Sequence, residues 1–188
     1  MIPGRDIASE ISSRVTADPT PSDFSVCHSH GCSKVVPTAI SDDQWASVTG
    51  FLETPPSSAG DERRQLVLAL AQMEKVVGEK VGTSQDLGGN MAGFGRKYQL
   101  DCVDEMTNTG TYLTMLSKEG LLRFHTPERR VTQSFFARSF WTHTVATVKE
   151  SETGQEYIID TWVLDNGETP YIMPIEDWDE GKELARVY

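Results

Sequence analysis

Hydrophobic and polar positions recur along the chain with two different periods, which separate a helical part from a strand-rich part. In residues 61–80 apolar side chains recur at spacings of four and three, the period of one face of an α-helix. Acidic residues gather at the start of this stretch, where they stabilise a helix N-terminus. We therefore predict a long helix over residues 61–80 that packs against a core through Leu66, Leu70, Met73 and Val77.

Two further helices are indicated by the residues that begin them. Ser41 and Gln44 stand at capping-box spacing, in which each side chain bonds the other residue's backbone N–H, so a short helix is expected there. Another helix is expected to begin at Cys102, after a glycine-rich loop over residues 81–101. A stretch rich in Pro, Ser and Gly, residues 54–62, is typical of a linker.

From Val131 onward the pattern is that of β-strands. The glycine-containing turn "SETG" joins two of them and is typical of a hairpin. The predicted strands are 131–140, 142–150, 155–164 and a short one within 168–178, besides a short or edge strand in 34–40. Because helices come first and an antiparallel sheet follows, the sequence predicts the α+β class.

Charge and hydropathy exclude some classes of partner. The chain has 188 residues and a formal net charge of −11, and its basic residues are scattered along the sequence. Such a chain repels phosphate backbones and anionic lipid head groups, so we expect no nucleic-acid partner. No apolar run approaches the ~20 residues of a membrane-spanning helix, and the first residues lack a signal-peptide pattern. Periplasmic and cytoplasmic locations both stay open, as does the oligomeric state.

Two of the three cysteines lie close together in the segment "CHSHGC". Thiolate and imidazole groups are zinc and copper ligands, which makes this segment a candidate metal site. Four ligands within six residues crowd one tetrahedral site, however, so a disulfide that closes a small loop is favoured over a metal, and a segment without either role is the third alternative. The residues concerned are Cys27, His28, His30 and Cys32. No cofactor is predicted.

The third cysteine, Cys102, stands in polar company at the expected start of a helix. A thiol attacks as its thiolate, and a helix N-terminus and a neighbouring imidazole both favour that form. The "SETG" hairpin places His143 nearly opposite Asp160, where the acid can hold the ring. We therefore predict Cys102 as nucleophile, His143 as base and Asp160 as its partner. The acidic neighbours Asp101 and Asp104 must point away, since negative charge opposes thiolate formation.

A rival base is His125, in the segment "RFHTPERR". Because it follows the Cys102 helix in a predicted loop beside several arginines, we expect it to face solvent. His143 is therefore preferred as the base.

A cysteine that begins a helix, a histidine on one strand and an aspartate on the next resemble the transglutaminase-like branch of the papain-like cysteine peptidases. The bacterial transglutaminase-like cysteine proteinases are the most similar type. The likeness covers residues 62 to 180, from "CVDEMTNTGTYLTMLSKEGLL" to the pattern Y-x-x-D-x-W at Tyr157, Asp160 and Trp162. It implies a core in which the cysteine helix packs on an antiparallel sheet. It also implies an N-terminal extension, residues 1–60, before a catalytic domain, residues 61–188.

The resemblance further implies acyl transfer through a thioester on Cys102, with a peptide or protein as substrate. Hydrolysis and transamidation both stay open, and hydrolysis is preferred because nothing in the sequence indicates a dedicated amine site. The backbone N–H of Cys102 is the first candidate to stabilise an oxyanion, and Gln99 or Tyr98 would supply the second donor. The alternative is a binding or scaffold module with a vestigial triad, whose N-terminal cluster serves metal binding or structure.

Overall fold

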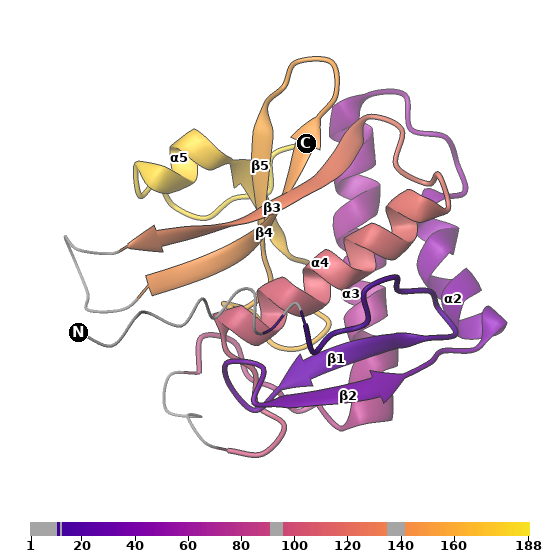
Figure 1. The fold of residues 1–188 in the computed structure, drawn as a ribbon. Helices are drawn as coiled ribbons and strands as arrows, with labels where there is room; N and C mark the ends of the chain where they lie inside the picture. Colours follow the sequence, from indigo (N-terminus) through magenta and orange to yellow (C-terminus); the bar gives the residue numbers. More distant parts are fainter. Residues whose placement is uncertain (1–10, 12, 91–95, 135–141) are drawn as a thin grey trace.

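The computed structural model describes residues 11, 13–90, 96–134 and 142–188 of the chain. Their order is a β-hairpin, two α-helices, the helix that begins at Cys102, and an antiparallel sheet that carries a short final helix (Figure 1). The elements are β1 (Phe24–His28), β2 (Lys34–Thr38), α2 (Asp42–Thr49), η1 (Gly50–Leu52), α3 (Ala59–Val81), α4 (Cys102–Lys118), β3 (His125–Ser134), β4 (Thr142–Glu150), β5 (Glu156–Asp160), β6 (Tyr171–Pro174) and α5 (Ile175–Asp179). The α+β class predicted from the sequence is confirmed.

The three predicted helices form for the reasons that the sequence indicates. Ser41 and Gln44 make the expected capping box at the start of α2. Helix α3 is capped by the Ser58 side chain and ends at Gly82, whose left-handed φ of 88° stops the helix. Helix α4 is capped by Asp101, so Cys102 is its first residue, as predicted.

The main sheet has four antiparallel strands in the order β3-β4-β5-β6, and β1 and β2 form a separate two-stranded sheet. The strand predicted over residues 131–140 begins earlier, at His125, because a register shift between Glu128 and Val131 lets the strand continue past its irregular middle. Residues 135–140 of that prediction lie outside the described residues. Strand β5 is shorter than predicted and ends at Asp160.

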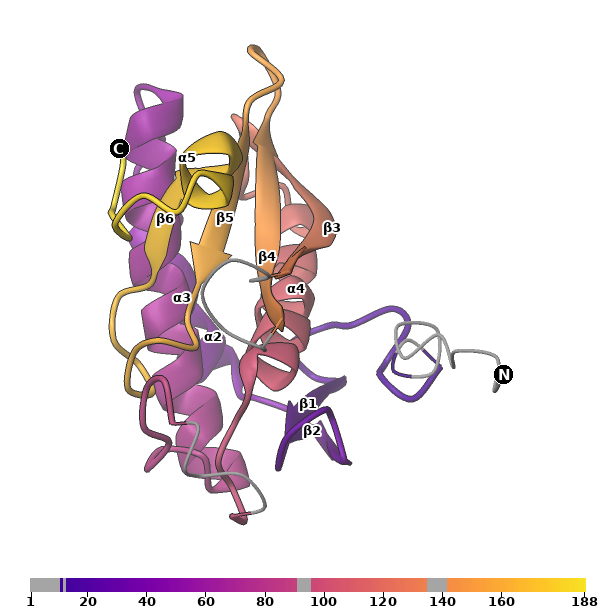
Figure 2. The ribbon, with the colours of Figure 1, turned by 90° about the vertical axis from the view of Figure 1, so that its left-hand side faces the viewer.

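Both faces of the main sheet are covered. One face packs on α3 and α4, and the other is covered in part by α5 (Figure 2). Because neighbouring strand residues point to opposite faces, β4 alternates between the two cores: Ala146 belongs to the α3–α4 side and Val145 to the α5 side. Strand β4 is therefore buried on both faces along most of its length.

The segment predicted as an N-terminal extension shares the larger of these cores. Its contributors are Phe24, Val26, Ile40, Val48 and Leu52, which pack with side chains of α3 and α4. The β1–β2 hairpin lies below the first half of α4 in Figure 1. The side-chain amide of Asn108 joins the two, because it accepts from the backbone N–H of Cys27 at 2.8 Å and donates to the carbonyl of the same residue at 2.9 Å. The boundary near residue 60 stays a prediction.

A membrane-spanning helix is absent from the described part of the chain, since none of its helices is both long and apolar enough.

Candidate functional site

Cys102 occupies the first turn of α4, and it is partly exposed. The carboxylate of Asp101 caps the helix by accepting from the backbone N–H groups of Val103 and Asp104, both at 3.0 Å. The N–H of Cys102 takes no part in this capping arrangement, and like the other first N–H groups of a helix it has no partner within the helix. The local sequence thus places a thiol, and an N–H donor that is not used for capping, at the positive end of a helix dipole.

The acidic neighbours of Cys102 accept hydrogen bonds from the loop between β1 and β2. Asp104 is buried, and its two oxygens accept from the backbone N–H groups of His30 at 2.8 Å and Cys32 at 2.6 Å. Asp101 accepts from Gly31 N–H at 2.9 Å. Both carboxylates are therefore directed toward this loop. Burial, followed by the charge of Asp101, raises the pKa of Asp104 to about 7, which reduces the negative charge beside the thiol.

The structure brings His143 and Asp160 together. The ring nitrogen Nε2 of His143 lies 2.7 Å from Oδ2 of Asp160, and both side chains are buried. The pairing of Ala146 with Ile159 shows that the two residues stand diagonally across β4 and β5, two positions from direct opposition, where the sequence predicted them nearly opposite each other. Diagonal neighbours share a face of the sheet, so the contact forms all the same.

His143 also lies within reach of Cys102. The thiol donates to the carbonyl oxygen of the preceding residue, Thr142, at 3.9 Å. Burial lowers the pKa of His143, but the hydrogen bond to Asp160 and then the nearby Cys102 outweigh burial and raise this pKa to about 9. Because Asp160 occupies Nε2, Nδ1 is the ring nitrogen that is left for the thiol. The three residues predicted from the sequence are thus close together.

Two tryptophan rings enclose His143. The ring of Trp162 lies 5.1 Å from the imidazole and that of Trp178 lies 5.9 Å from it, measured between centroids. Trp178, in α5, was not identified from the sequence, because nothing local shows that a C-terminal helix folds back over β4. Three buried polar atoms at this place have no hydrogen-bond partner among the described residues: His143 Nδ1, Asp160 Oδ1 and Trp162 Nε1. A site with unsatisfied donors and acceptors is suited to a polar ligand.

The N-terminal cluster contains a disulfide between Cys27 and Cys32. The sulfur atoms and a carboxylate oxygen of Asp104 lie within 4.8 Å of one another, a spacing that would suit a metal ion if the sulfurs were thiolates. Here the sulfurs are bonded to each other and the carboxylate accepts backbone N–H groups, so no thiolate is left for a cation. The metal interpretation does not fit this donor set, and His28 instead contacts Ser29 Oγ at 2.7 Å.

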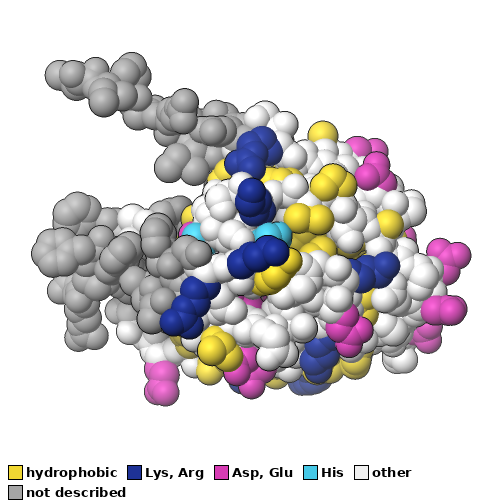
Figure 3. Space-filling view, turned by 90° about the horizontal axis from the view of Figure 1, so that it is seen from below, with side chains coloured by type: hydrophobic (Ala, Val, Ile, Leu, Met, Phe, Trp, Pro, Cys, Tyr) yellow, Lys and Arg dark blue, Asp and Glu magenta, His cyan; other side chains and the backbone are white. Residues whose placement is uncertain are grey.

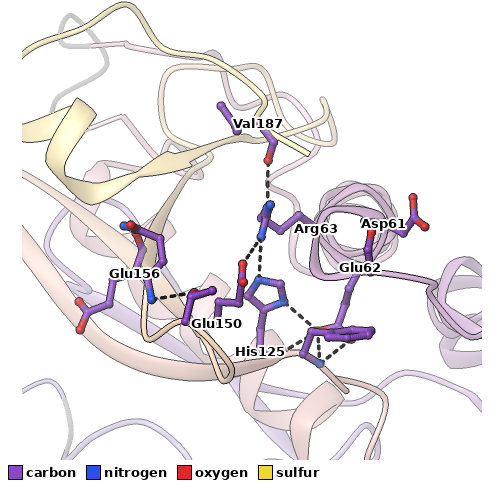
Figure 4. Close-up of polar contacts among 11 residues, drawn as sticks. Asp61, Glu62, Arg63, His125, Glu150, Glu156 and Val187 are labelled. Carbon is purple, nitrogen blue, oxygen red and sulfur yellow. Dashed lines mark hydrogen bonds and ion pairs between the residues drawn. The ribbon is translucent and has the colours of Figure 1, made fainter.

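His125 does not face solvent, and the prediction that it does is wrong. Its ring is fully buried, with Nδ1 2.9 Å from a carboxylate oxygen of Glu62 and Nε2 3.3 Å from Nη1 of Arg63 (Figure 4). Arginine only donates, so Nε2 is the acceptor and Nδ1 carries the proton toward Glu62. Arg63 continues to Glu150 at 2.8 Å, which leaves His125 no nitrogen for the thiol.

The candidate second donors for an oxyanion are engaged elsewhere or turned away. The side-chain oxygen of Gln99 accepts from Asn90 at 2.7 Å and its amide donates to the carbonyl of Gln85 at 3.0 Å, so this residue ties the loop before α4 together. The ring of Tyr98 packs against His28, with centroids 5.5 Å apart. Of the predicted oxyanion donors, the backbone N–H of Cys102 is therefore the one that remains a candidate.

A group of buried carboxylates beneath the start of α4 was missed by the sequence reasoning. Glu105 accepts from Thr161 Oγ1 at 2.9 Å, Glu74 from Gly167 N–H at 3.0 Å and Asp86 from Leu100 N–H at 2.8 Å. Burial is the first cause that raises the pKa of each, to about 8 for Glu74 and about 7 for Asp86. Only the fold brings these acids together, since they come from α3, α4 and the loop between them.

Comparisons with known proteins add no relative. No protein-family model matches the chain, and no match is found among curated proteins or among solved structures. The resemblance to the transglutaminase-like enzymes stays a prediction, and the site must be judged from its own geometry.

Proposed function

We propose that this protein is a thiol-dependent acyl-transfer enzyme that hydrolyses peptide or amide bonds through Cys102, His143 and Asp160. The observation that carries the proposal is the position of His143, whose Nε2 is held by Asp160 and which directly follows Thr142, the residue whose carbonyl accepts from the Cys102 thiol. A nucleophile, a base and an orienting acid in this order are what covalent acyl transfer requires.

The raised pKa of His143 gives it a proton to transfer at neutral pH. In the proposed reaction Cys102 Sγ attacks the carbonyl carbon, and the C–N bond breaks as His143 passes its proton to the departing nitrogen. A water molecule then gives a proton to His143 while its oxygen attacks the thioester, which releases a carboxylic acid and restores the Cys102 thiolate beside the His143 imidazolium. The Cys102 N–H would donate to the oxyanion in both steps.

The surroundings of the imidazole support this assignment. Asp160 is 1% exposed and His143 is 7% exposed, so their hydrogen bond is shielded from water. A charged pair in such a place is costly unless it is well paired. The His143–Asp160 pair differs from the buried His125–Glu62 pair in that it lies beside a thiol. The Trp162 and Trp178 rings supply the apolar cover on the side of the sheet that faces α5.

The experiment that tests the proposal is the rate of iodoacetamide labelling as a function of pH. Cys27 and Cys32 are bonded to each other, so unreduced protein should take up one label, on Cys102. We expect rapid labelling at pH 6, and a rate about tenfold lower in His143→Ala, because a thiol without its imidazole partner forms little thiolate there. His28→Gln, which changes a histidine near the same helix end, serves as the matched control.

A labelling rate that does not depend on His143 would contradict the proposal. If labelling of the native protein rises only near the ordinary thiol pKa of about 8.5 and His143→Ala leaves it unchanged, the enzyme proposal is wrong. The non-catalytic binding module would then be the better account. Mass spectrometry of a casein substrate incubated with and without a primary amine separates hydrolysis from transamidation, since only the latter adds the mass of the amine.

A further inference from the structure

Basic side chains gather on the face of the molecule that contains the disulfide loop. Figure 3 shows Lys and Arg side chains following one another across the middle of this face beside a histidine, while acidic side chains lie mostly toward its edges. We define the basic strip as Arg14, Lys34, Arg96 and Lys97, exposed residues of segments that meet at the disulfide loop. In a chain with a net charge of −11, such a local excess of positive charge needs an explanation.

Contacts between the segments hold the strip together. Arg14 Nη2 donates to the carbonyl of Ser33, next to Lys34, at 3.3 Å. The Nζ atom of Lys97 lies 4.5 Å from the centre of the Tyr98 ring, which in turn packs against His28. Burial, then Lys34 and then Lys97, lowers the pKa of His28, so both lysines act on the same imidazole from different segments.

Within the described residues none of the four cations forms an ion pair, whereas Arg63, Arg64, Lys118 and Lys182 do. Asp101 and Asp104, the acids that bond to the disulfide loop, form no ion pair with these cations. Asp104 is buried, and both it and Asp101 spend their oxygens on backbone N–H groups. Within the described part of the chain the strip therefore has no acidic ion-pair partner at the surface.

The strip lies next to the proposed nucleophile. The Ser29 N–H donates to the carbonyl of Gln99 at 2.9 Å, and the Gly31 N–H donates to Asp101 at 2.9 Å. These bonds tie the disulfide loop to the residues that immediately precede Cys102. A chain bound along the strip would therefore pass close to the start of α4.

We propose that the basic strip binds an acidic segment of the polypeptide on which Cys102 acts, so that the enzyme selects protein substrates in which negatively charged residues flank the cleaved bond. This inference rests on the proposed function, because it names the substrate class of the same site. Complementary charge guides encounter and fixes the register of a bound chain. The rest of the acidic surface repels such a segment and directs it to the strip.

A nucleic acid fits these observations less well. Its phosphates extend along the whole duplex at one charge per about 1.7 Å, so its binding needs a long basic surface, whereas the net charge of this chain repels it beyond the strip. A short acidic peptide needs only a few cations. The amide bonds of a polypeptide are also the groups on which the proposed chemistry acts.

The test uses the full chain with Cys102→Ala, which removes turnover but leaves the strip intact. A fluorescein-labelled peptide with six consecutive glutamates is titrated by fluorescence anisotropy, against the same peptide with glutamines. We expect the glutamate peptide to bind at least about tenfold more tightly, with an affinity that falls as salt rises. Lys34→Gln with Lys97→Gln should abolish this preference.

The matched control is Arg64→Gln with Lys182→Gln, which removes the same charge from exposed positions outside the strip. Equal loss of affinity in both double variants, or no preference for glutamate over glutamine, overturns the proposal. Tighter binding of single-stranded DNA than of the glutamate peptide also overturns it. Because this assay needs no thiol chemistry, failure here leaves the labelling result standing. Peptide binding by a protein with an unreactive Cys102 overturns the enzyme proposal, and with it the substrate role of the peptide, and leaves the strip as a binding site for acidic peptides.

Discussion

His143 and Asp160 are joined at 2.7 Å although they stand diagonally in the β4–β5 hairpin, and this bond holds the imidazole beside Cys102. The ladder between the strands ends at Ala146 and Ile159, so the two side chains meet where the strands separate. At this position the acid can reach a ring nitrogen while the opposite nitrogen stays available. The protonation state of His143 therefore depends chiefly on Asp160.

We expect Asp160→Asn to lower the pKa of His143 from about 9 toward its ordinary value of 6.5, because the substitution removes the carboxylate that stabilises the imidazolium. NMR titration of the histidine ring measures this pKa directly. Labelling of Cys102 at pH 6 should slow by about tenfold in the same variant. Asp43→Asn, on the exposed start of α2, is the control and should change neither quantity. A His143 pKa that stays near 9 in Asp160→Asn would show that the carboxylate is not its main support.

We expect reduction of the Cys27–Cys32 disulfide to destabilise the protein by about 2 kcal/mol, or roughly 5 °C in Tm, because a small loop gains freedom in the unfolded chain. Ser29, His30 and Cys32 have left-handed φ angles of 70°, 69° and 51°, which non-glycine residues adopt only when the fold holds them. Released from the disulfide, this loop should also loosen its bonds to Asp104.

Thermal unfolding with and without dithiothreitol measures the effect. The double variant Cys27→Ser with Cys32→Ser is the control, since it has no disulfide to reduce. If dithiothreitol lowers the Tm of that variant as well, the effect in the native protein cannot be assigned to the disulfide.

We expect Glu62→Gln to lower the free energy of unfolding by about 2–4 kcal/mol, because it removes a buried negative charge from a set of N–H donors. Glu62 is fully buried and accepts from the backbone N–H groups of Arg123, Phe124 and His125, besides His125 Nδ1. Urea unfolding measures the change. Glu79→Gln, exposed on the same helix, should be within about 0.5 kcal/mol of the native protein, and an equally small effect of Glu62→Gln would contradict a structural role for the buried network.

We expect the protein to unfold at a lower temperature at pH 9 than at pH 6. The pKa of Glu74 is raised from 4.5 to about 8 in the folded state, and that of Asp86 from 3.8 to about 7. The stability that these groups give is therefore fully present below their unfolded-state pKa values, and it is lost as the pH rises through the folded-state values. His143, raised to about 9, adds to the loss between pH 6.5 and 9. Together these groups should lower the Tm by about 5 °C or more.

Calorimetry across this range tests the pH dependence. Glu74→Gln mimics the protonated acid, so its Tm should vary less with pH than that of the native protein. Toward acid pH the trend reverses. Although burial acts to raise the pKa of Glu62, the hydrogen bonds from His125 and the backbone lower it, so the stability that Glu62 gives is lost only as pH falls below about 4.5. A Tm that is flat from pH 6 to 9 would contradict the prediction.

The sequence alone determined the features that depend on neighbours in the chain. Capping of α2 by Ser41, the start of α4 at Cys102 and the limits of β4 follow from short-range rules of hydrogen bonding and periodicity. The hairpin brought His143 to Asp160 because its short turn restricts the pairing to a few registers. For the same reason these residues could be chosen as a candidate site before any fold was known.

Only the tertiary structure decided what depends on packing between distant segments. His125 is buried because Glu62 and Arg63 of α3 reach its ring, and no local pattern around His125 indicates those partners. Asp104 serves the disulfide loop, which is far away in the sequence, and Trp178 returns from the C-terminal helix to cover His143. Local rules fix which residues begin a helix or a strand, whereas the burial of a charge and its partner are set by the free energy of the whole packed core.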